Sequence, residues 1–259
     1  MAQKKKENAV VVSQQRLAEG IYDLHLKTDM AQDAVCGQFV GVYPKNQSTL
    51  LPRPISICEV DRDKNELRLV YRVAGSGTSE FSRLKEGDTV ELLGVLGNGF
   101  PTGEAKPGMK ALLFGGGIGV PPILQLAKEL SCEKLIVPGY RDSQCFLKED
   151  FEKYGTVYTA TEDGSVGTKG NVLDAVRENG LKADIIYACG PMPMLRAIKQ
   201  YAIEQDIPAY ISLEERMACG VGACLGCVCK TAKKDHHSHV NNARICTDGP
   251  VFEAREVEI

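Results

Sequence analysis

Four cysteines close to the C-terminus constrain the fold of this chain more than any other feature of its sequence. Cys219, Cys224 and Cys227 follow the spacing C-x4-C-x2-C, and Cys246 lies further along. Three glycines separate the first three thiols, and glycine adopts backbone dihedrals that other residues avoid. Because the stretch beyond Ser212 is too short to build much of a core, we expect a metal centre to order it.

This spacing is that of plant-type ferredoxin loops, in which thiolates hold a 2Fe-2S cluster. It predicts an iron-sulfur site whose ligands are Cys219, Cys224, Cys227 and Cys246. Backbone N–H groups that approach the sulfurs would stabilise added negative charge on such a cluster. A structural zinc site is the alternative, since zinc also accepts four thiolates. Zinc sites generally use paired C-x2-C knuckles, however, and here the last ligand stands alone.

The remaining cysteines and the nearby histidines are not assigned to the metal. Cys229 is an alternative ligand, but it lies outside the loop pattern. Five other cysteines are scattered between Cys36 and Cys189, which is typical of small buried residues. Three histidines lie among charged residues before the fourth ligand and are expected in a solvated loop: His236, His237 and His239.

The first hundred residues contain six short β-like runs broken by turn residues. The runs are VVVSQQ, IYDLHLK, QFVGVY, PISICEV, ELRLVYRV and TVELLGVLG. Hardly any helical periodicity interrupts them, so they predict a small antiparallel barrel or sandwich. We assign residues 1–102 to this β barrel.

After a segment rich in Pro and Gly, the rhythm changes to alternating strands and helices. Apolar runs such as KALLF, KLIVPGY and DIIYA are followed by helical patterns such as ILQLAKEL, NVLDAVREN and MLRAIKQYAIEQ. This alternation predicts a parallel α/β sheet covered on both faces, over residues 103–212. Residues 213–259 then form a small C-terminal 2Fe-2S module.

Three elements of the first domain together predict a flavin dinucleotide site. The strand that opens with RPIS offers an arginine for phosphate, the run VYR offers an aromatic ring for stacking, and GSGT precedes a short helix whose N-terminus would receive a pyrophosphate. Each element alone is commonplace, and GSGT is more often a plain helix cap. The candidate residues are Arg53, Pro54, Ile55, Ser56, Val70, Tyr71, Arg72, Gly77 and Thr78.

Two turns in the second domain predict a nucleotide crevice. GGGIGVPP and CGPM each follow a predicted strand and precede a helix, so both lie at the carboxyl edge of the sheet, where phosphates bind. Cys189 would lie near the nicotinamide, although a buried inert thiol is the alternative. The candidate residues are Gly115, Gly116, Gly117, Gly119, Val120, Pro121, Cys189, Gly190, Pro191 and Met192.

Charge and the N-terminal sequence restrict the partners. A net charge of −3 and a pI near 5.9 provide no broad basic field for nucleic acid. The start, MAQKKKENAVVV, has only a very short apolar run, so we expect neither a signal peptide nor a membrane span and place the protein in the cytoplasm.

With these motifs in place, the chain resembles the ferredoxin reductase superfamily and, more closely, the electron-transfer subunits of NAD-dependent dihydroorotate dehydrogenases. The resemblance extends over nearly the whole chain, through RPIS, YR with GSGT, GGGIGVPP, CGPMPM, EERMACGVGACLGCVC and CTDGPVF. It implies FAD on the barrel, NAD(H) at the second domain, and a 2Fe-2S cluster on the four cysteines. It also implies a separate FMN-containing catalytic subunit that oxidises dihydroorotate to orotate, in a heterotetramer with two copies of each subunit.

A flavin exchanges electrons both in pairs and singly, so it would stand between the nicotinamide and the cluster. We therefore expect no catalytic acid or base on this chain. The alternatives are a subunit of another flavin complex, such as an NADH-dependent ferredoxin:NADP oxidoreductase or a sulfide dehydrogenase, and a zinc-stabilised scaffold module without redox chemistry. Arg141 and Asp142 give opposite indications on the choice between NADPH and NADH, and NADH rests on the resemblance.

Overall fold

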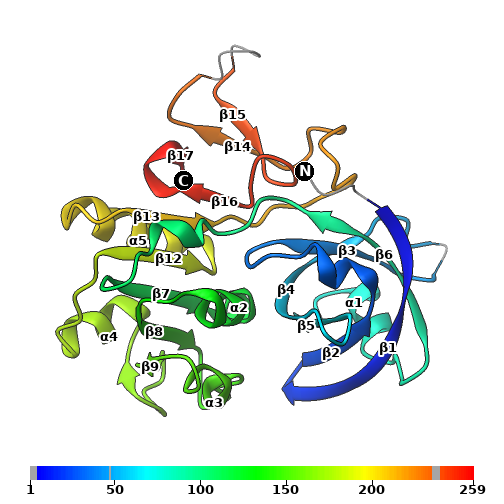
Figure 1. The fold of residues 1–259 in the computed structure, drawn as a ribbon, viewed down its shortest axis with the longest axis horizontal. Coiled ribbons are helices and arrows are strands. Elements are labelled where there is room, and N and C mark those ends of the chain that lie inside the picture. The colour runs from blue at the N-terminus through cyan, green and yellow to red at the C-terminus, as the bar shows by residue number, and fades with distance from the viewer. Residues whose placement is uncertain (1–4, 47, 235–239) are drawn as a thin grey trace.

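The structure is a computed structural model that describes residues 5–46, 48–234 and 240–259. It contains a closed antiparallel barrel, a mainly parallel sheet covered by helices, and a small three-stranded sheet near the C-terminus (Figure 1). The predicted combination of a barrel, an α/β domain and a C-terminal module is confirmed.

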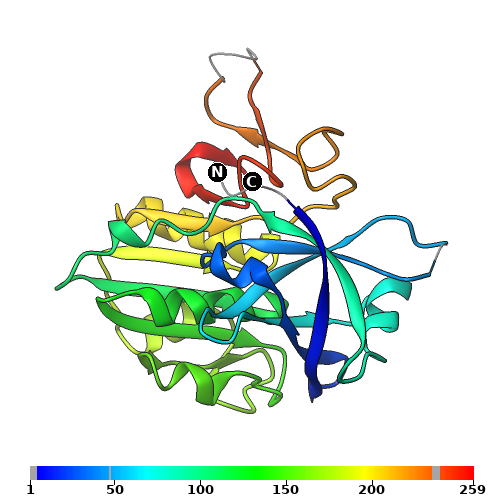
Figure 2. The same ribbon diagram turned by 45° about the vertical axis from the view of Figure 1, so that its right-hand side comes forward.

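Each of the six predicted β runs forms one strand of the barrel. Alternate residues of each strand point inward and fill the barrel with Val, Leu, Ile and aromatic side chains. The long strand β1 runs from top to bottom along the front of the barrel wall in Figure 2. The order around the barrel is β1 (Lys5–Ala18), β2 (Ile21–Lys27), β5 (Glu66–Arg72), β4 (Arg53–Asp61), β3 (Phe39–Tyr43) and β6 (Thr89–Leu96). The short helix α1 (Ser76–Phe81) follows β5, and the 3-10 turn η1 (Asp29–Gln32) follows β2.

The second domain is a sheet with helices on both faces. Helix α2 packs on the face that turns toward the barrel, whereas α4 and α5 pack on the opposite face. The strand order is β11 (Thr168–Lys169), β10 (Ala160–Thr161), β8 (Glu133–Tyr140), β7 (Lys110–Gly116), β12 (Ile185–Cys189), β13 (Ala209–Ser212) and β16 (Val251–Glu253), and β9 (Thr156–Val157) also pairs with β8. The helices are α2 (Pro121–Glu129), α3 (Lys148–Phe151), α4 (Val172–Glu178) and α5 (Met192–Glu204), with 3-10 turns η2 (Thr102–Glu104) and η3 (Gly117–Gly119).

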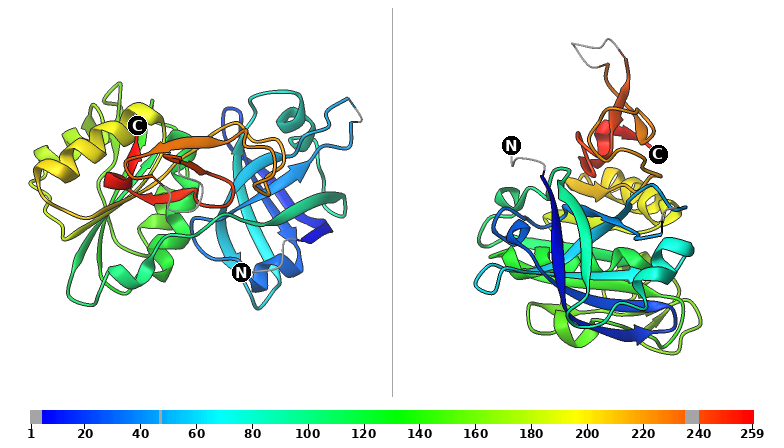
Figure 3. Two further views of the ribbon diagram at one scale, coloured as in Figure 1. Left: turned by 90° about the horizontal axis from the view of Figure 1, so that it is seen from above. Right: turned by 90° about the vertical axis from the view of Figure 1, so that its right-hand side faces the viewer.

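The C-terminal segment crosses from one sheet to another. Strands β14 (Val228–Thr231), β15 (Asn242–Arg244) and β17 (Val257–Glu258) form the small sheet, and the turn η4 (Ala254–Glu256) precedes β17. Between β15 and β17 the chain returns to add β16, antiparallel, to the edge of the large sheet. Seen from above, the segment lies over the junction of the two larger domains (Figure 3).

The barrel and the α/β domain share a continuous core. Phe100, in the connecting segment, packs edge-on against Tyr187 of β12, with 5.7 Å between the ring centroids. The buried Gln125 side chain of α2 accepts a hydrogen bond from the Val60 amide of β4 at 2.8 Å. In the described parts of the chain, no helix has the length and apolar character needed to cross a membrane.

Candidate functional site

The first candidate site lies where β4 begins beside α1. The Arg53 side chain passes over Gly77, because a Cβ atom on Gly77 would lie only 2.8 Å from Arg53 Nε. Its guanidinium donates to the Leu51 carbonyl at 2.7 Å. The Thr78 hydroxyl accepts hydrogen bonds from the amides of Ala74 and Gly75, and so fixes the start of the helix. An arginine therefore lies beside a glycine-lined helix start, as a phosphate site requires.

The other residues of RPIS lie on the same strand. Pro54, Ile55 and Ser56 are half-buried at the start of β4, where Pro54 and Ile55 pair with Gly41 and Val40 of β3. The strand is thus held in place by the barrel while its side chains keep partial access to solvent.

The expected stacking role of the Tyr71 ring is wrong. Tyr71 is 2% exposed and points into the barrel core, where it stacks on Tyr22 and meets Phe81 edge-on. Its hydroxyl donates to Gln14 Oε1 at 2.8 Å, and burial raises its pKa. Val70, its neighbour, is buried against the α/β domain. For both residues only the backbone remains available to a cofactor.

The two predicted nucleotide turns lie side by side. Strands β7 and β12 are parallel neighbours, and Gly115 pairs with Cys189 in their register. A Cβ atom on Gly119 would lie 2.5 Å from the Cys189 carbonyl oxygen, and one on Gly190 would lie 3.1 Å from Gly116 Cα. Glycine is therefore required by the close contact between the two turns at the carboxyl edge of the sheet, the edge where phosphates bind in such domains.

The residues after the turns begin two helices. Val120 and Pro121 are buried at the start of α2, and Pro191 and Met192 form the start of α5. Proline suits a first helical turn because its missing N–H has no partner to lose there.

Cys189 lies at the end of β12 and is half-buried. Burial raises the pKa of its thiol to about 12, and a hydrogen bond with Ser212 opposes that rise only in part. Ser212 ends the adjacent strand β13, directly beside it in the register. The thiol is therefore neutral near pH 7, which makes it an uncharged wall of the crevice rather than a nucleophile.

The loop between Cys219 and Cys227 has the geometry of a cluster-binding loop. The amides of Val221 and Cys224 point at the Cys219 sulfur, at 3.5 and 3.4 Å. Burial would raise the pKa of Cys219, but these hydrogen bonds outweigh it and lower the pKa to about 6. The loop therefore stabilises negative charge on sulfur, as ligation to iron requires. Gly220 and Gly222 provide the left-handed turns, with φ of 67° and 85°.

The four thiols form two pairs. The Cys224 amide donates to the Cys219 sulfur, and the Cys246 amide donates to the Cys227 sulfur, each at 3.4 Å. Burial, followed by the Cys227 neighbour, raises the pKa of Cys246 to about 12. Among the described residues, no three His, Cys, Asp or Glu side chains form a group that would hold a single metal ion. Four thiolates in two pairs fit the two irons of a 2Fe-2S cluster, each of which takes two thiolates.

Cys229 lies on β14 opposite Ala243, where burial raises the pKa of its thiol. Its exclusion from the ligand set remains a prediction. His236, His237 and His239, expected in a solvated loop, lie outside the described residues.

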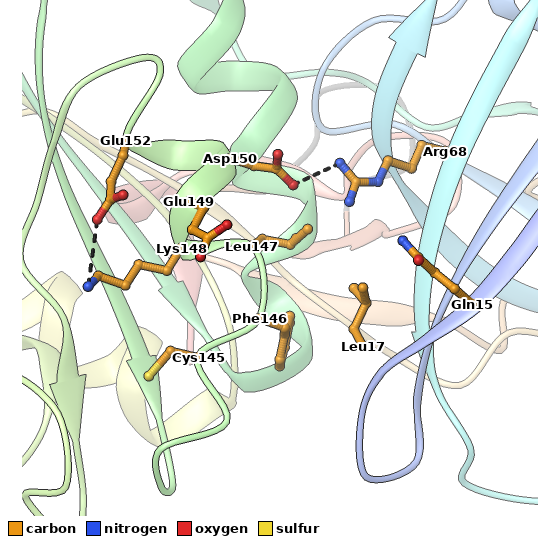
Figure 4. Close-up of a pocket in the computed structure, with 10 residues that line it drawn as sticks. All are labelled: Gln15, Leu17, Arg68, Cys145, Phe146, Leu147, Lys148, Glu149, Asp150 and Glu152. Carbon is orange, nitrogen blue, oxygen red and sulfur yellow. Dashed lines mark hydrogen bonds and ion pairs between the residues drawn. The ribbon is translucent and has the colours of Figure 1, made fainter.

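Sequence reasoning missed a polar pocket between the two larger domains. A cavity of about 460 Å³ is lined by β1, by Arg68 of β5 and by the residues around α3 (Figure 4). Arg68 forms ion pairs with Asp23, Glu59 and Asp150, at 2.8 to 3.1 Å. The alternation of β5 indicates that Arg68 points away from the barrel core. Nothing in the sequence indicates that another domain covers that face.

Comparison with known proteins decides the family. Residues 214–258 match the iron-sulfur cluster binding domain of dihydroorotate dehydrogenase B, and residues 113–200 match the oxidoreductase NAD-binding domain. The electron transfer subunit of dihydroorotate dehydrogenase B (NAD(+)) from Geobacillus sp. (strain WCH70) is 43% identical over 98% of both chains. The corresponding subunit from Bacillus mycoides (strain KBAB4) is 46% identical over 97% of this chain and 98% of its own.

The chain belongs to the family of dihydroorotate dehydrogenase B electron transfer subunits. Among solved structures, a chain of the NADH-dependent reduced ferredoxin-NADP oxidoreductase, which was studied for flavin-based electron bifurcation, is similar to this chain, with a TM-score of 0.85. It is 28% identical over 96% of this chain and 89% of its own. The ferredoxin reductase of carbazole 1,9a-dioxygenase shares the fold, with a TM-score of 0.68 over 80% of this chain and 69% of its own, at 21% identity.

Membership in the dihydroorotate dehydrogenase B family confirms the predicted class, an NAD-linked oxidoreductase subunit that transfers electrons. It also confirms the cofactor set of FAD, a 2Fe-2S cluster and NAD(H). The residues that hold these groups, and the domain limits at 102 and 212, remain predictions.

Proposed function

We propose that this chain carries electrons from an FMN-containing catalytic subunit, which oxidises dihydroorotate to orotate in UMP biosynthesis, to NAD+. A 2Fe-2S cluster and FAD are its carriers, and the assembly contains two copies of each subunit. The relatives are named electron transfer subunits of dihydroorotate dehydrogenase B, and this name supports a catalytic partner. When bound, the flavin supplies exchange of electron pairs with nicotinamide and of single electrons with the cluster.

The barrel would hold FAD with two groups of residues, one for the pyrophosphate and one for the ring system. Arg53 and the amide-rich start of α1 at Gly77 and Thr78 suit the pyrophosphate. The half-buried strand from Pro54 to Ser56, and the backbone from Val70 to Arg72, suit the ring system. The cradle at Gly77, which a Cβ atom would fill, supports this assignment.

The α/β domain would hold NAD(H) at its two glycine turns. Gly115 to Gly117, with Gly119 to Pro121, form one wall, and Cys189 to Met192 form the other. NADH is assigned over NADPH from the name of the relatives. We assign no general acid or base to this chain, because the proton chemistry of dihydroorotate belongs to the partner.

The cluster would take Cys219, Cys224, Cys227 and Cys246. The single observation that supports the electron route most is the contact of this loop with the barrel. A Cβ atom on Gly220 would lie 3.1 Å from Leu96 Cδ1 of β6, so the cluster loop packs directly on the domain assigned to FAD.

The test replaces one ligand in the complex purified with its FMN-containing partner. Cys224→Ser should lose iron while keeping FAD, and NADH should still bleach the FAD absorbance. Passage of electrons from dihydroorotate to NAD+ should fall by more than about 10- to 100-fold, the loss typical of removing even an outer-shell partner of a metal ligand. Rapid-mixing absorbance and iron and sulfide analysis provide the measurements.

Cys229→Ser is the matched control, because it removes a thiol two positions beyond a proposed ligand. It should keep its iron and its rate. Full iron content and undiminished passage between the subunits in Cys224→Ser would contradict the proposed route. Wild-type protein that is prepared anaerobically, retains FAD and yet contains neither iron nor acid-labile sulfide would contradict the cluster itself.

A further inference from the structure

An arginine of the barrel reaches into the nucleotide turn of the other domain. Arg72 is the last residue of β5, and a Cβ atom on Gly117 would lie 3.4 Å from Arg72 Nη2. Gly117 has a φ of 52° and begins η3, the turn that leads from β7 into α2. The end of β5 and η3 are in contact. Arg72 thus lies outside residues 113–200, the part that matches the NAD-binding domain, yet borders its glycine turn.

The guanidinium of Arg72 is exposed and uncommitted. Over the described residues, it forms neither a hydrogen bond to a side chain or backbone nor an ion pair. Arg68, four positions earlier on the same strand, is by contrast held by three carboxylates. A charged group that is held near a turn but has no partner in the protein is available to a ligand.

The turn beside it offers matching donors. The amides of Gly117 and Ile118 are the first two of η3, and the first amides of a helical segment have no acceptor within it. The Arg72 guanidinium lies beside this turn, and it and the amides are all donors to negative oxygens. A pyrophosphate supplies such oxygens on two adjacent phosphorus centres.

The two arginines near the cofactor sites lie beside different turns. Arg53 lies against Gly77 at the start of α1, whereas Arg72 lies against Gly117 at the start of α2. The flavin cradle therefore has its own arginine. Arg72 extends away from that cradle and across the domain boundary.

We propose that the Arg72 side chain binds the pyrophosphate of NAD(H), so that the barrel domain completes the nucleotide site of the α/β domain. This inference rests on the proposed function, which assigns NAD(H) to the turn at Gly117. It assigns the Arg72 side chain to NAD(H), whereas the Arg72 backbone remains part of the proposed FAD site. Because the arginine comes from the flavin domain, nucleotide binding also fixes the two domains relative to each other.

The probe is ADP-ribose, which carries the pyrophosphate but no nicotinamide and cannot reduce the flavin. Arg72→Ala, in the complex with the partner subunit, should weaken ADP-ribose binding by about tenfold to a hundredfold, the worth of a hydrogen bond between charged groups. Binding should also become less sensitive to salt, since one phosphate contact is lost. Arg72→Lys should restore part of the affinity, because it keeps the charge without the planar fork. Titration calorimetry at two salt concentrations measures all three.

Arg177→Ala is the control for the loss of a positive charge. Arg177 lies in the last turn of α4, at the opposite end of the helix from the nucleotide edge. It should leave ADP-ribose binding unchanged. Loss of FAD from Arg72→Ala would overturn the proposal by assigning the side chain to the flavin, and unchanged affinity and salt dependence would overturn it outright. Failure of the proposed function would be distinguishable, because the wild-type protein would then bind no ADP-ribose or would lack FAD and iron.

Discussion

Arg68 of β5 and Asp150 of α3 form an ion pair across the boundary between the barrel and the α/β domain, with 3.1 Å between Nη1 and Oδ2. The same guanidinium binds Asp23, whose side chain is only 1% exposed, and Glu59. The pair lies at the edge of the cavity in Figure 4. Since β5 carries both Arg68 and Arg72, this contact also sets where Arg72 meets the nucleotide turn.

Removing Arg68 should destabilise the protein strongly. Arg68→Ala leaves the carboxylate of Asp23 buried without its main partner, and breaking a buried pair in this way costs about 3 to 5 kcal/mol. The free energy of unfolding, from urea denaturation of the FAD-loaded protein followed by circular dichroism, measures the loss.

The exposed pair between Lys64 and Asp61 provides the comparison for that experiment. Lys64→Ala should leave the free energy of unfolding nearly unchanged, because solvent screens such pairs. Equal effects of the two substitutions would show that Arg68 contributes no more than a surface charge.

His25 should make stability depend on pH near neutrality. A hydrogen bond to Asp23 and a second to Glu66 raise the pKa of His25 in the folded protein. A raised pKa adds stability that is complete below the ordinary histidine pKa of about 6.5 and is lost as pH rises through the folded value. The free energy of unfolding should therefore fall from about pH 6 upward, relative to His25→Gln, in which this slope should vanish. Parallel curves for the two proteins would refute the assignment.

The contact between the two nucleotide turns predicts a severe effect of one methyl group. Gly119→Ala would place Cβ within 2.6 Å of three backbone atoms of Cys189 and Gly190, so the turns must separate. NADH binding should weaken at least about tenfold, with a loss of roughly 1 to 3 kcal/mol in stability from overpacking. Gly103→Ala, where no atom lies within 4 Å of the added Cβ, should be neutral in both equilibrium titration and denaturation. Normal NADH affinity in Gly119→Ala would remove the turn from the nucleotide site.

Local patterns in the sequence were sufficient to predict the strands but not what covers them. In β5, Leu67, Leu69 and Tyr71 alternate and share the inward face of the barrel. This period of two places the Tyr71 ring inside, and the expectation of flavin stacking failed because it followed residue type instead of alternation. Arg68 faces outward by the same rule, yet it is largely buried because another domain lies there. Contacts between domains depend on tertiary packing, which no short window of sequence reports.

In the C-terminal segment, too, local features were predictable from the sequence and long-range pairing was not. The spacing of Cys219, Cys224 and Cys227 is local, so the thiol loop was predictable from its glycines and its intervals. The return of β16 to the edge of the large sheet was not, because Val251–Glu253 is a three-residue strand whose partner, β13, lies about forty positions earlier.

Removing iron and sulfide should loosen the cysteine loop while the strand that follows it stays in place. The amides of Val221, Cys224, Gly226 and Cys246 donate only to sulfur atoms of the loop, so their order depends on what those sulfurs bind. Strand β16, by contrast, pairs by backbone with β13, and the Leu213 amide donates to the Pro250 carbonyl at 2.9 Å. Hydrogen exchange of the chelator-treated protein should therefore rise at residues 219–227 and stay low at residues 251–253, with α5 as the internal reference. Equal loss of protection in β16 would mean that the cluster, rather than the sheet edge, anchors the whole segment.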